Sequence, residues 1–210
     1  MKSEKRFQIF AHAVLVLLSV FALLPMLLMV MSSITDNDTL ISEGYSFIPS
    51  KFSFYAYEYI FKTGNSVLRA YGVSIVLTVV GTVCALTITT LLAYAISKKD
   101  MPGRGLITFF VIFSMLFNGG LVPTYIVYTK TFHVNNTFWG LLIPGLLLNG
   151  FNVMLMKSYF VSSIPEEILD AAYIDGASET KTFLKVVIPL SKPILATIAL
   201  FSGIAYWNDW

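Results

Sequence analysis

The chain has 210 residues, of which 56% are hydrophobic and only 12% are charged, and its mean hydropathy is +0.75. Soluble domains carry roughly 25% charged residues, and a soluble chain of this length could not bury so much apolar surface. The net charge of +2 gives no indication of nucleic-acid binding. The composition therefore predicts an all-α protein in lipid, a polytopic bundle of membrane helices.

Long uncharged segments give the expected spans in chain order. A bilayer core about 30 Å thick needs roughly 20 apolar residues of helix. Four intervals between charged residues are long enough, at 7–35, 70–97, 105–129 and 131–156. A fifth uncharged run, 193–208, is shorter and ends close to Trp210. We therefore expect about five spans in this chain, with the last one cut short.

The distribution of lysine and arginine gives the expected orientation. Cytoplasmic loops carry an excess of these residues, and a cytoplasmic N-terminus would place ten of the fourteen on the inside. The first apolar run is longer than a signal-peptide core of about 7–15 residues, so we expect an anchored first helix. This topology makes 36–66 an extracytoplasmic loop and 157–192 a cytoplasmic loop.

The first four expected spans contain no Asp, Glu, Lys or Arg. Proton-driven transporters commonly keep ionisable groups in the membrane, whereas sodium can bind to unwound backbone carbonyls. The sequence has no GKS or GKT phosphate loop, and Cys84 has no partner at metal-ligand spacing. We expect no catalytic activity, no metal and no cofactor, so uphill transport would need energy from a partner.

The segment "VSSIPEEILDAAYIDGASETKTFLKVVIPLSKP" is conspicuously polar for this chain. Ser163 and Glu166 have the spacing of a capping box, and Pro165 suits the first turn of a helix. Gly176 suits the left-handed position that ends a helix. These signals predict a sharply ended helix of about three turns.

A small-residue face is the second feature of this segment. By helical spacing, one face carries Ile168, Ala171, Ala172 and Asp175. A second amphipathic helix is expected from about Ser178, with breaks at Pro189 and Pro193. The residues alone leave two interpretations open, a docking element for another protein or a simple amphipathic connector.

The same segment resembles the cytoplasmic loop signature of permease subunits of binding-protein-dependent ABC importers. That signature reads E-A-A, three residues, G, nine residues and I-x-L-P. Here "DAA" begins at Asp170, the glycine is Gly176, and Val186–Pro189 reads "VVIP". The departures are Asp for Glu, Val for Ile and Ile for Leu.

Three further stretches extend the resemblance over nearly the whole chain. "DGAS", "AYAISKKDMPGRG" and "WND" are similar to the sugar-transporting branch, in particular to the maltose-type second permease. "FNGGLVPTYIVY" resembles permeases for complex oligosaccharides. The resemblance implies the ABC importer permease fold, a single permease domain over 1–210 and residence in a bacterial inner membrane. Because that family has six or more spans, we expect a last helix and a cytoplasmic tail to be missing here.

The resemblance also implies a function and a set of partners. The chain would translocate a sugar or oligosaccharide, driven by ATP hydrolysis in a separate ATP-binding cassette subunit. Its other partners would be a second permease in a heterodimer, an extracytoplasmic solute-binding protein and membrane lipid. The residues assigned to ATPase coupling are Glu167, Asp170, Ala171, Ala172, Asp175, Gly176, Ala177 and Pro189.

Polar residues in or near the spans are candidates for a solute pathway. Gly119, Gly120 and Pro123 are expected to interrupt span three, and Asn149 and Asn152 to share a face of span four. Amides also act as helix–helix contacts worth about 1 kcal/mol, and aromatic residues near span ends often form interface belts. The candidates are Asn118, Tyr125, Asn149, Asn152, Trp207 and Asn208.

Two other functional classes fit the sequence less well. A secondary transporter or channel would need coupling carboxylates or a ring of charge within the spans. A membrane enzyme would need a catalytic cluster at the membrane edge, such as a DxD or HxxxD set. The carboxylates gather instead in the segment that resembles the coupling loop.

Overall fold

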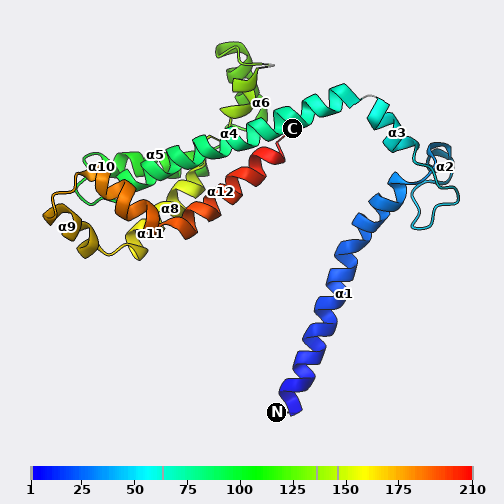
Figure 1. Ribbon diagram of the computed structural model, residues 1–210, viewed down its shortest axis with the longest axis horizontal. Coiled ribbons are helices and arrows are strands. Elements are labelled where there is room, and N and C mark those ends of the chain that lie inside the picture. Colours follow the sequence, from blue (N-terminus) through cyan, green and yellow to red (C-terminus); the bar gives the residue numbers. More distant parts are fainter. Residues whose placement is uncertain (1, 63, 136, 146, 210) are drawn as a thin grey trace. The chain divides into compact units, whose positions relative to one another are not determined.

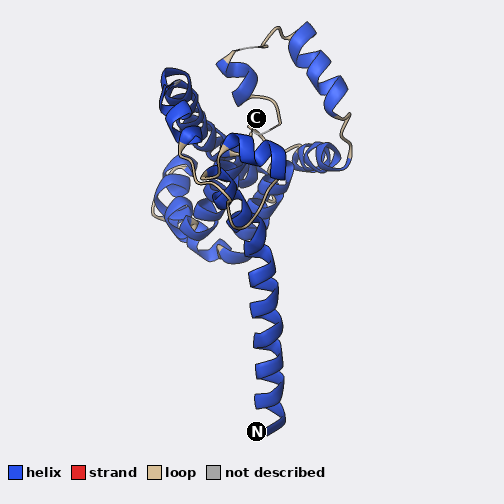
Figure 2. Cartoon of the chain, turned by 90° about the vertical axis from the view of Figure 1, so that its right-hand side faces the viewer, coloured by secondary structure: helices blue, strands red, loops and turns tan. Residues whose placement is uncertain are grey.

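The computed structural model describes residues 2–62, 64–135, 137–145 and 147–209. This part of the chain consists of helices and loops without a strand (Figure 2), and one isolated antiparallel bridge joins Thr35 and Phe52. The predicted all-α class is therefore confirmed for the described residues. The chain packs as two compact units, 1–70 and 71–210. A single permease domain over 1–210 stays a prediction.

The first unit contains α1 (Lys2–Ser33), α2 (Asn37–Glu43), α3 (Tyr55–Lys62) and the beginning of α4. The loop between α1 and α3 folds back on itself through Asp36 and Lys51. The Asp36 N–H donates to the Lys51 carbonyl at 3.0 Å, and their side chains pair at 3.3 Å. A 2.8 Å hydrogen bond between the hydroxyls of Ser33 and Tyr57 joins the end of α1 to α3.

The second unit holds most of the helices, coloured from cyan to red in Figure 1. Two of its elements, η1 and η2, are π-helical turns. The elements are α4 (Gly64–Ser97), α5 (Arg104–Leu116), α6 (Leu121–Ile126), η1 (Val127–Thr131), α7 (Phe138–Leu142), α8 (Gly150–Ser163), α9 (Glu166–Ile174), α10 (Glu179–Thr182), η2 (Phe183–Val187), α11 (Ile188–Leu190) and α12 (Lys192–Trp207).

The core of the second unit lies among α4, α5, α8 and α12, which run side by side in Figure 1. Its most deeply buried side chains come from α4, α8, η2 and α12. They are Ala93, Ile96, Val153, Met156, Val187 and Ile198. The ring of Tyr94 packs into the same core, with its centroid 4.7 Å from that of Phe183 and 6.0 Å from that of Phe160.

A second contact between α4 and α12 depends on the absence of a side chain at Gly81. A Cβ there would lie 2.6 Å from the ring of Tyr206, which is 1% exposed. The Tyr206 hydroxyl also donates to the carbonyl of Leu142 at 2.9 Å. Gly81 therefore allows one aromatic ring to hold α4, α12 and the end of α7 together.

The predicted spans agree with the structure at α1 and α4, which are long and apolar enough to cross a membrane. The third predicted span breaks between α5 and α6, and the two parts are bent by 114°. Gly120 has a φ of +88° at this break, as the glycine pair predicted. Pro123 does not interrupt the helix, because it lies in the first turn of α6.

The structure differs most from the prediction at the fourth span. The interval 131–156 forms α7, an irregular stretch and the start of α8, in place of one helix. Pro144 lacks the N–H that would extend α7, and Gly145 has a φ of +76°. Asn149 then caps α8 by accepting the N–H of Asn152 at 3.2 Å. Asn149 and Asn152 do not share a helix face, since Asn149 precedes the helix.

The predicted fifth span is α12. Together with the segment 179–190 it forms another bent pair, with an angle of 80° between its parts. The described residues thus contain two continuous candidate spans, and up to four when each bent pair counts as one.

Substitution of Gly81 tests the contact between α4 and α12. Gly81→Val should lower the free energy of unfolding in detergent by about 1–3 kcal/mol, because the new side chain overlaps the Tyr206 ring. Gly72→Val is the matched control on the same helix, since nothing lies within 4 Å of a Cβ at that position. Equal stability of the two variants in a denaturation series would contradict this packing.

Candidate functional site

The N-terminus of α9 differs from the predicted capping box. Proline disfavours helical backbone in the residue before it, and Ile164 is extended, with φ −110° and ψ 107°. The preceding helix, α8, therefore runs to Ser163 and ends there, while Pro165 precedes α9 without a side-chain capping bond. The capping role predicted for Ser163 is wrong. Glu166 pairs instead with Lys99, at 2.8 Å between Oε1 and Nζ.

The C-terminus of α9 has the predicted glycine geometry. Gly176 has a φ of +74°, in the left-handed region that favours glycine. Its N–H donates to the Tyr173 carbonyl at 3.0 Å, and the Ala177 N–H donates to the Ala172 carbonyl at 2.9 Å. These two bonds form a Schellman motif, so α9 ends sharply and its last carbonyls are satisfied.

The face of α9 that is exposed is not quite the face that the sequence predicted. Leu169 packs against the core of the second unit, and Ala172 is half-buried on the same side. Ile174 is 86% exposed, and sequence reasoning missed it, although its position three residues after Ala171 is a usable signal. The other predicted coupling residues are also at the surface. Glu167, Asp170, Ala171, Asp175, Gly176 and Pro189 are exposed, and Ala177 is half-buried.

A groove with a volume of about 1110 Å³ separates much of α9 from the rest of the second unit. The ends of α4 and α8 form one wall, and residues of α9 form the other. Leu169 packs against the core, and polar contacts join α9 to the residues that follow α4. Two consecutive lysines, Lys98 and Lys99, make these contacts at opposite ends of α9.

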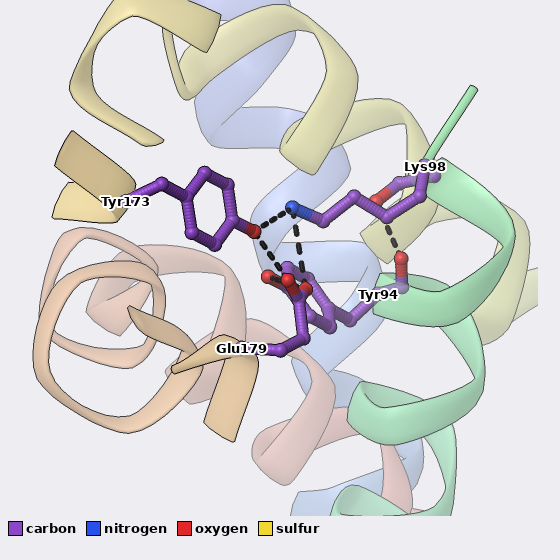
Figure 3. A network of polar contacts seen from close by, with 5 residues as sticks. Tyr94, Lys98, Tyr173 and Glu179 are labelled. Atoms are coloured by element: carbon purple, nitrogen blue, oxygen red, sulfur yellow. Dashed lines mark hydrogen bonds and ion pairs between the residues drawn. The ribbon is translucent and has the colours of Figure 1, made fainter. Parts of the chain in front are cut away.

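Four side chains form a polar network at the C-terminal end of α9 (Figure 3). We call Tyr94, Lys98, Tyr173 and Glu179 the Glu179 cluster. The Tyr94 hydroxyl donates to Glu179 Oε1 at 2.5 Å, and Lys98 Nζ lies 3.3 Å from the same oxygen. The Tyr173 hydroxyl donates to Glu179 Oε2 and accepts from Lys98 Nζ at 3.0 Å. One carboxylate thus joins α4, α9 and α10.

The Glu179 cluster is better shielded than the pair at the other end of α9. The side chains of Lys98 and Glu179 are 28% and 56% exposed, against 70% and 66% for Lys99 and Glu166. The Lys98 ammonium also lies over the rings of Tyr94 and Tyr173, at 4.8 and 5.4 Å from their centroids, where the ring faces attract a cation. Partial burial raises the pKa of Glu179, but hydrogen bonds from both tyrosines and the charge of Lys98 lower it more. The pKa of Glu179 therefore lies below its ordinary value.

The segment after α9 begins a helix at Ser178 as predicted, but it does not break at the two predicted prolines. Ser178 caps α10 by accepting the N–H of Lys181 at 3.4 Å. Pro189 and Pro193 do not break the chain, because each lies in the first turn of a helix, α11 and α12. The bend falls between them, at Ser191.

A second groove, of about 810 Å³, lies beside the break between α5 and α6. It brings Asn118 and Asn149 together, along with Tyr128. Asn118 Oδ1 accepts the N–H of Gly120 at 2.8 Å and so stabilises the break. The other solute-pathway candidates are not among its lining residues. Asn152 is buried in α8, Tyr125 is exposed on α6, and Trp207 and Asn208 are exposed at the end of α12.

Hydrogen exchange tests the end of α9. Gly176→Val should cost about 1 kcal/mol or more in backbone strain and speed exchange of the Gly176-position and Ala177 amides. Gly176→Asn should exchange nearly as slowly as the wild type, because asparagine tolerates the left-handed region. The space around the position is open, so steric overlap does not confuse the comparison. Identical exchange in both variants would contradict the Schellman assignment.

Comparison with known proteins identifies relatives along nearly the whole chain. Residues 87–210 match the family described as "Binding-protein-dependent transport system inner membrane component". Protein LplC of Bacillus subtilis (strain 168) is 40% identical over 188 residues, which cover 90% of this chain and 62% of LplC. The polygalacturonan/rhamnogalacturonan transport system permease protein YtcP of the same organism is 34% identical over 207 residues, covering 99% of this chain and 71% of YtcP.

A solved structure agrees with these relatives. It is a crystal structure of a bacterial ABC transporter involved in the import of the acidic polysaccharide alginate. The TM-score is 0.85 and the sequence identity 33%, with 99% of this chain and 73% of that chain covered. The family resemblance of the loop motif is thereby confirmed: the chain belongs to the inner-membrane components of binding-protein-dependent transport systems, and it matches the permease chain of an ABC importer.

Proposed function

We propose that this chain is the permease subunit of an ABC importer that carries a sugar or oligosaccharide across the membrane. ATP hydrolysis in a separate ATPase subunit drives the transport. The observation that carries this proposal is α9, a short helix that ends in a Schellman motif. A groove lies between α9 and the ends of α4 and α8, and one face of α9 is exposed. Membership of a family of binding-protein-dependent transport components supports it.

The exposed face of α9 has the chemistry of a docking surface. Ala171 is small and lets another surface approach closely, while Ile174 adds an apolar side chain that is 86% exposed. Glu167 and Asp170 place negative charge beside it, which favours a basic rim on the partner. We therefore assign this face to the ATPase subunit, with Asp175, Gly176 and Ala177 shaping its end.

The topology belongs to the same proposal. We place the N-terminus and 157–192 in the cytoplasm and 36–66 outside, because ten of the fourteen basic residues then lie on the inside. A second permease subunit would complete the pathway, and an extracytoplasmic binding protein would deliver the solute. Labelling of cysteines placed at Lys99 and Lys51, from each side of the membrane, measures this orientation.

We assign the solute pathway to the groove beside the α5–α6 break. Asn118 and Asn149 offer amide groups to sugar hydroxyls, and Tyr128 offers a ring face and a hydroxyl. No charged residue is among the described residues that line this groove, which suits a polyhydroxylated solute. Relatives named for diacetylchitobiose and arabinooligosaccharides support an oligosaccharide as the solute. Tyr125, Asn152, Trp207 and Asn208 stay candidates outside this groove.

A charge on the exposed face of α9 tests the docking assignment. In the assembled transporter, Ala171→Asp should abolish uptake and reduce ATPase retention in a pull-down by about tenfold or more, because the charge would be desolvated without a partner. Ala171→Ser, which keeps the side chain small, and Lys181→Ala, at an exposed position of α10, should be nearly silent. Retention of the ATPase by Ala171→Asp at the wild-type level would refute the docking face.

Substitution of Asn149 tests the pathway without removing the cap of α8. Asn149→Asp keeps a capping acceptor but replaces the amide with a charge. Its KM for the transported oligosaccharide, identified with an uptake panel, should rise about tenfold. Asn208→Asp makes the same change away from this groove and should leave KM within about twofold. A larger effect at Asn208 would move the pathway to the end of α12.

A further inference from the structure

We propose that the Glu179 cluster is the mechanical link that carries movement of α9 into α4. Tyr173 and Glu179 are its positioning residues, and Tyr94 of α4 and Lys98, directly after α4, are its anchor. The inference rests on the proposed function, since it supposes that an ATPase acts on α9. It gives a role to Tyr173 and Glu179, which occupy positions that the loop motif leaves unspecified, and to two residues at the end of α4, and none of the four lines the solute groove.

One carboxylate, that of Glu179, bridges separate helices. Glu179 Oε1 receives the Tyr94 hydroxyl and lies 3.3 Å from Lys98 Nζ, both from the α4 end. Glu179 Oε2 receives the hydroxyl of Tyr173 in the last turn of α9. Because each oxygen has a charge-assisted contact, the carboxylate is fixed in position and in orientation.

The connection from α9 to Glu179 is short and closed by hydrogen bonds. Only six positions separate Tyr173 from Glu179. The Schellman bonds of Gly176 and Ala177 close the end of α9, and the Ser178 cap starts α10 directly afterwards. Any tilt of α9 must therefore either displace the partners of Glu179 or break their hydrogen bonds.

The anchor on α4 is held inside the core. The Tyr94 ring packs against Phe160 of α8 and Phe183 of η2, and Tyr94 itself is 9% exposed. The groove runs along α9 and is lined by the four cluster residues as well, and Leu169 of α9 packs against the core. A displacement of the cluster would therefore move the end of α4, which is a candidate membrane span, and the helices packed on α4.

The pair between Lys99 and Glu166 provides a matched comparison. Lys99 directly follows Lys98, so this pair also joins the end of α4 to α9, but its side chains are 70% and 66% exposed. Exposed ion pairs of this kind hold little energy. Neutralising Lys99 therefore removes one positive charge from the same loop without touching the cluster.

The experiment compares Tyr173→Phe and Glu179→Gln with Lys99→Gln. A nitroxide on a cysteine at Ile174, in a chain with Cys84→Ser, reports the motion of α9 in the absence of the ATPase. Unlabelled variants are measured in the assembled transporter for ATPase retention, ATP hydrolysis and uptake. We expect both cluster variants to mobilise the nitroxide and to import about tenfold less solute per ATP hydrolysed, with normal ATPase retention. Lys99→Gln should leave both readouts within about twofold of the wild type.

Two results would overturn the link. One is an unchanged nitroxide spectrum in both cluster variants, which would show that the cluster does not hold α9. The other is a mobilised nitroxide with normal uptake per ATP, which would show that the cluster holds α9 without transmitting movement. Failure of the proposed function is separately visible, because the wild-type chain would then retain no ATPase, and the transmitting role would fall with it.

Discussion

The constraint on which this fold depends is that an apolar solvent offers no hydrogen bonds to the backbone. A chain of this composition can leave a helix only where its own groups satisfy the freed N–H and C=O groups. Three of the breaks in the second unit have such a solution. Asn118 accepts the Gly120 N–H, Asn149 accepts the Asn152 N–H, and Tyr206 donates to the Leu142 carbonyl. Two of these capping residues, Asn118 and Asn149, also line the groove assigned to the solute.

The two ends of α9 also differ in how well their polar groups are satisfied. Its last turn is satisfied twice, by the Schellman bonds and by the Glu179 cluster, whereas its first turn has an exposed ion pair and no side-chain cap. A helix that is held more firmly at one end passes a displacement on through that end. The Glu179 cluster is therefore where movement of α9 would reach α4, and the groove beside α9 provides the space for that movement.

Local signals made much of this structure predictable. Hydropathy indicated the helical class and the continuous helices α1 and α4, and a glycine pattern indicated the break at Gly120 and the left-handed Gly176. Errors arose where a neighbour overrode a local signal, as when Pro165 holds Ile164 extended and removes Ser163 from its expected capping role. The Glu179 cluster could not be predicted, because only tertiary packing brings its members together. Lys98 and Tyr173 are 75 residues apart in the sequence, and Tyr94 and Glu179 are 85 residues apart. Nor did the residues around Pro144 indicate that Asn149 would begin a new helix.

The π-helical turn η2 lies between Glu179 and the bend at Ser191. In it the Ile188 N–H reaches back five residues to the Phe183 carbonyl, so this turn holds one residue more than an α-helical turn would. Deleting one residue here would restore ordinary helix while rotating everything on its N-terminal side by about 100° around the axis. Glu179 would then face away from Tyr94 even though every side chain of the cluster was still present. The number of residues in this interval is thus as much a part of the cluster as its four side chains.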